Sequence, residues 1–401
     1  MSSRRGALAT QLSAQLLFTL GAIAILGPFG TDVYLPAFPQ MATSLHTSAA
    51  GIQLTLTAFT VGMALGQLTM GSLSDRVGRK PLIVLGCLVM FGASGLASFA
   101  QDLLVLMFCC LFIGIAASAG MVCGRAMVSD LATGSEAAKG FSVLGIVAGL
   151  GPILGPIGGA LIMQLSDWRG IFGSLSLLAL AFVFLGFFGL RETLAVAKRH
   201  SGGLVEMFTT MGKVVSNRNF LTHAIILWAG FGMMFAYISA SPFVLQNVFG
   251  FSPLAYTIDF GANGLALMFT GFLSASLVKK IEPFSQVRIG VSMQLLAAAL
   301  IGFGYLSGSV PLWASIFAFA LIPSSLGFVF GPVTALALSQ VRHSAGTALA
   351  VMGAIQFVLA GIAAFVVGLG GAMDLKPLAI TLAILAAIAL SGLFLTPKAS
   401  K

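Results

Sequence analysis

Long apolar runs alternate with short polar breaks along the whole chain of 401 residues. Each run holds about 20 residues, which as a helix can cross the roughly 30 Å hydrocarbon core of a bilayer. The breaks are too short to hold a sizeable soluble domain. The pattern therefore predicts an all-α integral membrane protein with about twelve transmembrane helices. The predicted spans are 14–36, 51–72, 81–100, 103–126, 140–164, 169–190, 219–245, 252–277, 286–307, 311–338, 344–368 and 375–396.

The predicted helices fall into two sets of six, and an internal repeat relates the two sets. The segments 71–80 (GSLSDRVGRK) and 271–280 (GFLSASLVKK) share glycine, leucine, serine and basic residues at matching positions. Both segments follow the second span of their set, so the sets have the same orientation and form a parallel repeat. We therefore expect an N-terminal six-helix bundle at 1–190, a central cytoplasmic linker at 191–218 and a C-terminal six-helix bundle at 219–401.

Charged residues are scarce and unevenly distributed. They make up 8% of the chain, whereas soluble proteins carry about 25% charged residues. The net charge of +9 comes from short basic clusters between apolar runs, without the aromatic-interleaved basic face that nucleic-acid binding needs. With the N-terminus inside, the inner loops collect nearly all lysines and arginines, and the outer loops keep only Arg169 and Lys376. This asymmetry predicts that both termini are cytoplasmic, with the lipid bilayer and not nucleic acid as the partner.

The sequence lacks the motifs of the main rival classes. It contains no His-Glu-x-x-His zinc motif, and no Lys-Ser or Lys-Thr pair that would complete a phosphate-binding loop. Its histidines are scattered, and its four cysteines lie inside apolar runs without zinc-ligand spacing. We therefore expect no enzyme, no ATP-driven engine, no metal and no cofactor. We also expect the chain to act as a monomer.

Four stretches carry a family resemblance. The segment 71–81 (GSLSDRVGRKP) resembles the signature loop of the major facilitator superfamily. The segment 149–159 (GLGPILGPIGG), in span five, resembles the antiporter signature of its exporters. The segments 30–39 (GTDVYLPAFP) and 235–245 (FAYISASPFVL) are similar to those of the Bcr/CflA group of bacterial drug:proton antiporters, which includes close relatives of the chloramphenicol exporters.

The resemblance implies a fold of two six-helix bundles, in a multi-pass protein of the bacterial inner membrane. It also implies export of small amphipathic drugs in exchange for protons by alternating access. Export of a metabolite such as a sugar, nucleoside or amino acid remains the alternative. One departure concerns span four, where the family has an arginine in an Arg-x-x-Gln-Gly/Ala pattern that is thought to help couple proton and substrate binding. Here the segment reads Cys110-Leu-Phe-Ile113-Gly114, without the arginine and the glutamine.

Asp32 is the strongest candidate for proton coupling. It is the only acid placed firmly within the first predicted span, where a charge costs roughly 3 kcal/mol or more. A carboxyl group withdrawn from water takes up and releases a proton nearer neutral pH than a hydrated one. We expect Asp32 in the outer third of the span, facing a cavity. The alternative is a wetted acid at a helix end with no role in transport.

The signature segment is predicted to act as a cytoplasmic gate. Its mixed charges suggest a salt-bridge lock between helices that holds one conformation, whereas a plain positive anchor would need only basic residues. The residues expected to form this gate are Gly71, Asp75, Arg76, Gly78, Arg79 and Lys80.

The antiporter-like helix is predicted to pack closely and to bend. Its glycines permit close helix approach at a small-xxx-small spacing, and its prolines remove backbone donors. Simple helix packing is the alternative reading. The residues concerned are Gly151, Pro152, Gly155, Pro156 and Gly159, together with Gly149.

Polar and flexible side chains within the spans are candidates for the lining of a substrate cavity, although each of them is also typical of hydrogen bonding between helices. The candidates are Tyr34, Gln53, Thr57, Arg125, Met234, Tyr237, Asn263 and Gln356. For Arg125 the alternative is a snorkelling side chain paired with Asp130 near the cytoplasmic end of span four. Asp259, near the start of span eight, is expected at the outer interface and not in the pathway.

Overall fold

The computed structural model describes residues 13–132, 134–196, 199, 204–308, 310–341, 345–371 and 374–396. Within these residues the regular structure is helical, without a strand, and twelve helices are long and apolar enough to cross a membrane. The first span is broken into α2 (Ala14–Ala24), α3 (Leu26–Asp32), η1 (Leu35–Ala37) and α4 (Phe38–Ser44). The next five helices are α5 (Ala49–Val77), α6 (Arg79–Ala97), α7 (Leu103–Leu131), α8 (Gly134–Leu165) and α9 (Trp168–Gly189).

The second set of spans follows a short helix, α10 (Leu204–Val215), which lies in the predicted linker. Its helices are α11 (Arg218–Phe243), continued by η3 (Val244–Val248), then α12 (Pro253–Leu277), α13 (Pro283–Leu306), α14 (Leu312–Ser339), α15 (Ala345–Gly368) and α16 (Lys376–Leu395). The fold class predicted from the sequence is thereby confirmed. The proposed division of the chain at 191–218 stays a prediction.

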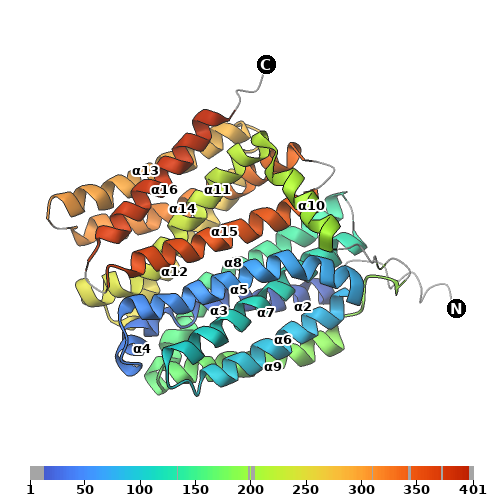
Figure 1. The fold of residues 1–401 in the computed structure, drawn as a ribbon, viewed down its shortest axis with the longest axis horizontal. Coiled ribbons are helices and arrows are strands. Elements are labelled where there is room, and N and C mark those ends of the chain that lie inside the picture. Colours follow the sequence, from blue (N-terminus) through green and yellow to red (C-terminus); the bar gives the residue numbers. More distant parts are fainter. Residues whose placement is uncertain are drawn as a thin grey trace.

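The helices run side by side in two groups, with the early helices below and the late helices above in Figure 1. The first span begins and α16 ends at the same end of the molecule, which we call the terminal face; we call the opposite end the distal face (Figure 1). Helix α5 packs along α15, and α8 packs along α12, so these two pairs form the seam between the groups.

Three helix ends lie five or more residues further along the chain than the apolar runs predicted. The first span continues to Ser44 and not 36, α5 to Val77 and not 72, and α7 to Leu131 and not 126. The extra turns of α5 and α7 hold polar side chains that both bond to Arg79, at the start of α6, at the terminal face, as described below. Hydropathy alone therefore placed these two ends too early, because those turns are stabilised by polar contacts and not by lipid.

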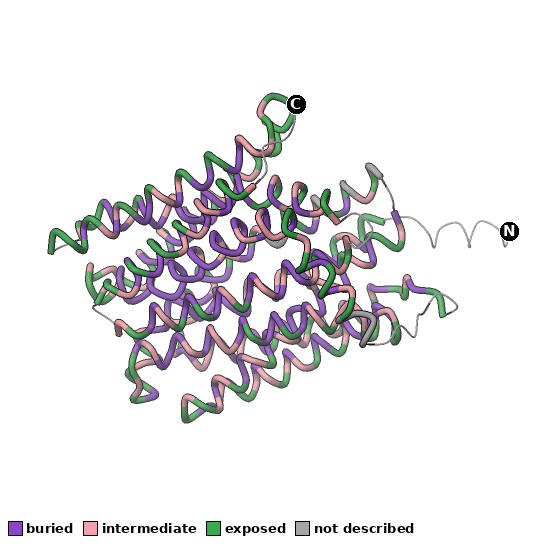
Figure 2. Tube along the Cα trace, turned by 45° about the horizontal axis from the view of Figure 1, so that its top comes forward, coloured by how far each residue is buried: buried purple, intermediate pink, exposed green. Residues whose placement is uncertain are grey.

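Buried positions lie mainly along the helices in the middle of the molecule, and exposed positions lie along the peripheral helices and loops (Figure 2). Large apolar side chains such as Phe18, Phe188 and Phe272 are among the exposed ones. A soluble protein rarely exposes so much apolar surface, whereas a bilayer covers it.

Glycines allow α5 and α7 to cross in close contact. A Cβ atom added at Gly62 would meet the carbonyl oxygen of Leu111, and one added at Gly114 would meet that of Phe59. Any side chain at either position would push the two helices apart, so these glycines set the packing inside the first group.

Candidate functional site

Asp32 lies inside the protein at the break in the first span. It is the last residue of α3, and its side chain is 3% exposed. It lines a small pocket of about 20 Å³ together with Pro152 of α8, Tyr237 of α11 and Asn263 of α12. That volume has room for about one water molecule. The geometry therefore favours the buried acid over the wetted helix end.

The glycine face of α8 packs against the backbone that carries Asp32. A Cβ atom at Gly155 would lie 3.3 Å from Asp32 Cβ, and one at Gly159 would collide with the carbonyl oxygen of Val33. Gly151 faces Pro28 in the same way, so three glycines at i, i+4 and i+8 share this contact.

Another face of α8 packs against α12, across the seam. The Thr257 hydroxyl donates to the carbonyl oxygen of Pro156 at 3.4 Å. A Cβ atom at Gly264 would lie 3.1 Å from the Ile153 side chain, and one at Gly149 would lie 3.5 Å from Met268. The antiporter-like helix α8 therefore packs between the backbone around Asp32 and helix α12 of the second group.

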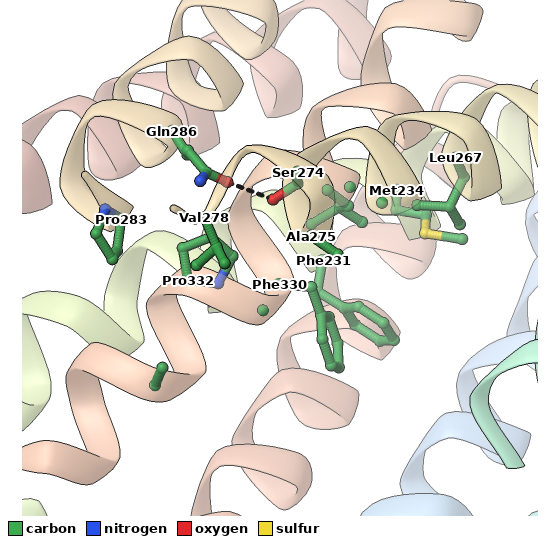
Figure 3. Close-up of a pocket in the computed structure, with 15 residues that line it drawn as sticks. Phe231, Met234, Leu267, Ser274, Ala275, Val278, Pro283, Gln286, Phe330 and Pro332 are labelled. Atoms are coloured by element: carbon green, nitrogen blue, oxygen red, sulfur yellow. Dashed lines mark hydrogen bonds between the residues drawn. The ribbon is translucent and has the colours of Figure 1, made fainter. Parts of the chain in front are cut away.

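A larger cavity of about 500 Å³ lies in the second group, towards the terminal face. Its walls are mostly apolar, with Phe231 and Met234 from α11, Leu267 from α12 and Phe330 from α14. Figure 3 shows Met234 and Leu267 at one end of the cavity, and Pro283 and Gln286 at the other.

The two polar side chains of this cavity, Ser274 and Gln286, are hydrogen-bonded to each other. Ser274 Oγ donates to Gln286 Oε1 at 2.5 Å (Figure 3). Met234 and Leu267 also line the Asp32 pocket. The cavity and the pocket are therefore adjacent spaces that share a wall.

A second cavity, of about 430 Å³, lies between α2, α7, α8 and α15 and contains Arg125. The predicted pairing of Arg125 with Asp130 is wrong, because Asp130 instead bonds to Arg79 and Thr193. Residues five apart on a helix of 3.6 residues per turn point about 140° apart, so the two side chains leave different faces of α7. Arg125 is exposed and makes no ion pair with a residue that the structure describes.

Several predicted cavity residues instead hold helices together. Gln53 Nε2 donates to the Ser239 carbonyl at 2.8 Å, and the Thr57 hydroxyl donates to the Gly361 carbonyl at 3.1 Å. Both bonds join α5 to the second group.

The remaining candidates divide between the interior and the cavities. Tyr34 is buried beside Thr55 in the first group. Gln356 is buried on α15 and lines none of the three spaces described above. Of the eight candidates, Met234, Tyr237, Asn263 and Arg125 line one of these spaces. The presence of a polar side chain within a span did not indicate whether that side chain would line a cavity or bond to another helix.

The two groups of helices meet closely near the distal face. Gln246 Nε2 donates to the Pro36 carbonyl at 3.2 Å, and the Phe38 and Phe243 ring centroids lie 5.9 Å apart. The two large cavities, by contrast, extend from mid-span residues such as Phe231 and Ala24 towards the terminal face. The structure is thus closed on the distal side of Asp32.

The signature segment forms the end of α5, a glycine hinge and the start of α6. Gly78 supplies the hinge with a φ of 111°, which favours glycine. Arg79 then binds Asp75 at 2.7 Å and Asp130 of α7 at 3.3 Å, and it also bonds to Ser74. A mixed-charge cluster between helices is therefore present, and its role as a gate stays a prediction.

Glu192, just after α9, completes this cluster and was not predicted from the sequence. Its carboxylate accepts hydrogen bonds from the backbone N–H groups of Arg79 at 3.1 Å and Lys80 at 3.2 Å. A carboxylate at a helix N-terminus satisfies unpaired donors and interacts favourably with the helix dipole. In the repeat, neither Lys279 nor Lys280 makes an ion pair with a described residue.

Cys110, at the position of the missing arginine, is buried in α7 and interacts with the Tyr34 hydroxyl. No other group replaces the missing positive charge, because Asp32 makes no ion pair within the described part of the chain.

Asp259 is half-buried near the distal end of α12, and its expected place at the outer interface stays a prediction. Its Oδ2 accepts a hydrogen bond at 3.2 Å from Asn263 Nδ2, and Asn263 lines the Asp32 pocket. The i, i+4 spacing of these two residues on one helix face was the available signal.

Comparison with known proteins identifies the family. The model of the Major Facilitator Superfamily matches residues 20–365. The chain is 34% identical over 385 residues to the uncharacterized MFS-type transporter YdgK of Bacillus subtilis (strain 168), across 94% of this chain and 95% of that protein. It is 30% identical over 375 residues to a chloramphenicol resistance protein of Pseudomonas aeruginosa, across 90% and 85% of the two chains.

A solved D-xylose-proton symporter has the same fold, with a TM-score of 0.72 over 96% of this chain and 97% of that one, at 17% sequence identity. The chain belongs to the major facilitator superfamily, in its Bcr/CflA drug-exporter branch. It is a transporter and not an enzyme, and a multi-pass protein of the bacterial inner membrane.

Proposed function

We propose that this chain exports small, amphipathic, largely apolar drugs in exchange for protons by alternating access. The observation that carries the proposal is the apolar cavity of about 500 Å³, which shares Met234 and Leu267 with the pocket of a buried carboxyl group, Asp32. One space fits a drug, and the adjacent space holds a group that can carry a proton.

The size and lining of the cavity support a drug over a hydrophilic metabolite. Ligand sites for drug-sized molecules measure about 300–1,000 Å³ and are mainly apolar. A sugar or nucleoside would need several free hydrogen-bonding groups, whereas Ser274 and Gln286 of this cavity are bonded to each other. The name of the Pseudomonas aeruginosa relative, a chloramphenicol resistance protein, supports the same choice.

Asp32 supports proton exchange because it is buried and has no positive partner among the described residues. A carboxyl group withdrawn from water favours its neutral form, and contact with water favours release of the proton. Movement of the two groups of helices that opened this pocket to water on one side would therefore release a proton there.

The basic loops support a cytoplasmic terminal face. In that orientation the large cavities lie towards the cytoplasm, and the contacts near Pro36 and Phe243 close the outer side. The proposed cycle then loads drug from the cytoplasmic side and opens to the outside by separating these contacts.

Efflux from an efflux-deficient bacterium tests the proposal. We expect cells that express the chain to accumulate less chloramphenicol and ethidium than cells with an empty vector, and a protonophore to abolish the difference. Asp32→Asn should keep membrane expression and lose the efflux driven by a pH gradient. Accumulation equal to the empty vector, or efflux that survives the protonophore, would contradict proton-driven drug export.

A further inference from the structure

A polar cluster in the second group of helices faces Asp32. Asn263 Nδ2 lies 3.2 Å from Asp259 Oδ2 and 3.1 Å from the Tyr237 hydroxyl, so one amide group contacts both side chains. Asn263 and Tyr237 also line the pocket that contains Asp32. Asp32 therefore lines this pocket directly, and Asp259, from the other group of helices, is connected to it by one hydrogen bond to Asn263.

Two buried tyrosines lie beside this cluster. The Tyr237 hydroxyl accepts the hydrogen bond from Asn263, and the Tyr256 hydroxyl is within 3.5 Å of Ser241 Oγ. Both rings pack against Phe260 of α12, with centroids 5.6 Å and 5.8 Å away. The tyrosines thus bury the part of α12 that carries Asp259 and Asn263.

Neither acid makes an ion pair with a positive side chain in the part of the chain that the structure describes. Around α12, helix α14 has no titratable residue, and neither do η1 and η3. The charged residues of α8, Glu136 and Lys139, lie at its opposite end, near the terminal face. Asp259 makes no ion pair with a described residue. Two unpaired carboxylates within membrane spans are costly unless at least one of them carries a proton.

We propose that Asp259 is a second proton-binding group of this exporter, coupled to Asp32 through Asn263 and Tyr237. The inference rests on the proposed proton-driven export. Loss of a proton from Asp259 changes its hydrogen bond to Asn263, and Asn263 lines the pocket of Asp32. The protonation of one acid therefore alters the surroundings of the other, and the two acids titrate as a coupled pair.

The arrangement places one member of the pair on each moving part. Asp32 belongs to the first span, and Asp259 belongs to α12 on the other side of the seam. Any movement between the groups of helices changes the separation of the two acids, and with it their affinity for protons. A transport cycle that uses both acids exchanges about one proton more per drug molecule than a cycle that uses Asp32 alone.

Infrared spectroscopy of the purified protein tests the pair without a drug. Protonated carboxyl bands are recorded between about pH 5 and about pH 9 for the unaltered protein, Asp32→Asn, Asp259→Asn and the control Glu282→Gln. Glu282 is exposed and makes no capping bond to its helix. We expect each aspartate variant to lose one titrating band and to shift the other, and the control to change neither. Unaltered bands in Asp259→Asn would overturn the proposal.

Transport in proteoliposomes separates this inference from the proposed function. The protons exchanged per chloramphenicol molecule should fall by about one in Asp259→Asn, while drug binding persists. Absence of chloramphenicol transport by the unaltered protein would contradict the proposed function and leave the infrared result to decide on Asp259. Transport with an unchanged proton ratio in Asp259→Asn would contradict the second proton-binding group alone.

Discussion

The carboxylate of Glu192 connects the signature segment to the residues that directly follow α9. It accepts from two backbone N–H groups at the start of α6, while its neighbour Thr193 donates to Asp130 at 2.8 Å. Asp130 also binds Arg79, so α5, α6, α7 and the end of the first six spans meet at one cluster. The two copies of the repeat differ at these positions, since the segment 271–280 holds Ala275 and Ser276 where the segment 71–80 holds Asp75 and Arg76.

Replacement of Glu192 by alanine should impair transport, because it leaves the N–H groups of Arg79 and Lys80 without their acceptor. Loss of a helix cap costs about 1 kcal/mol, with a range of about 0.5–2. We expect drug efflux to fall several-fold with membrane expression retained, measured beside Glu282→Ala as a control. Asp75→Ala should resemble Glu192→Ala, whereas Lys279→Ala should not. Equal losses at Glu192 and Lys279 would contradict a dominant role for the first copy of the repeat.

Among the individual helices, α8 connects the backbone around Asp32 to the second group of helices. Three glycines on one face contact the backbone around Asp32, while Ile153 and Pro156 contact α12. The close approach is possible only because a glycine has no Cβ atom, so the glycine spacing and the position of Asp32 depend on each other.

Gly159→Ala tests this packing, since its Cβ atom would collide with the Val33 carbonyl oxygen. Overpacking of this kind costs about 1–3 kcal/mol. We expect a lower unfolding temperature in detergent and loss of most drug efflux. The neighbouring Gly158→Ala is the matched control, because nothing lies within 4 Å of its Cβ position. Similar behaviour of the two variants would show that α8 does not position the first span.

At the scale of the whole molecule, the two groups of helices are held together near the distal face and leave cavities towards the terminal face. The Phe38–Phe243 contact and the Gln246–Pro36 hydrogen bond both cross between the groups. Alternating access requires that such contacts separate in every cycle.

A covalent cross-link between positions 38 and 243 should therefore stop transport. Phe38→Cys and Phe243→Cys, combined in a background in which the four buried native cysteines are replaced, can be joined by a bifunctional thiol reagent with a reducible spacer. We expect treated cells to lose efflux and a reductant to restore it, while each single variant stays active after the same treatment. Full efflux by the cross-linked double variant, with the cross-link verified by mass spectrometry, would contradict separation of these contacts during transport.

Apolar length and local motifs determined much of this protein from the sequence alone. The stretch 252–277 was predicted as a span, and α12 covers Pro253–Leu277. Transfer of an apolar helix into a bilayer depends on the residues of that helix, so its position is a local property of the sequence. The signature segment and the glycines of α8 are likewise local patterns.

Only the tertiary structure decided how polar side chains are paired. Gln53 bonds to Ser239, which is 186 residues away in the chain. Arg125 points into a cavity and not to Asp130, and Asp259 joins the cluster beside Asp32. A buried polar group requires a partner, but the partner's identity depends on which helices pack together and at what rotation. That information is spread over the whole chain, so local reading of the sequence does not contain it.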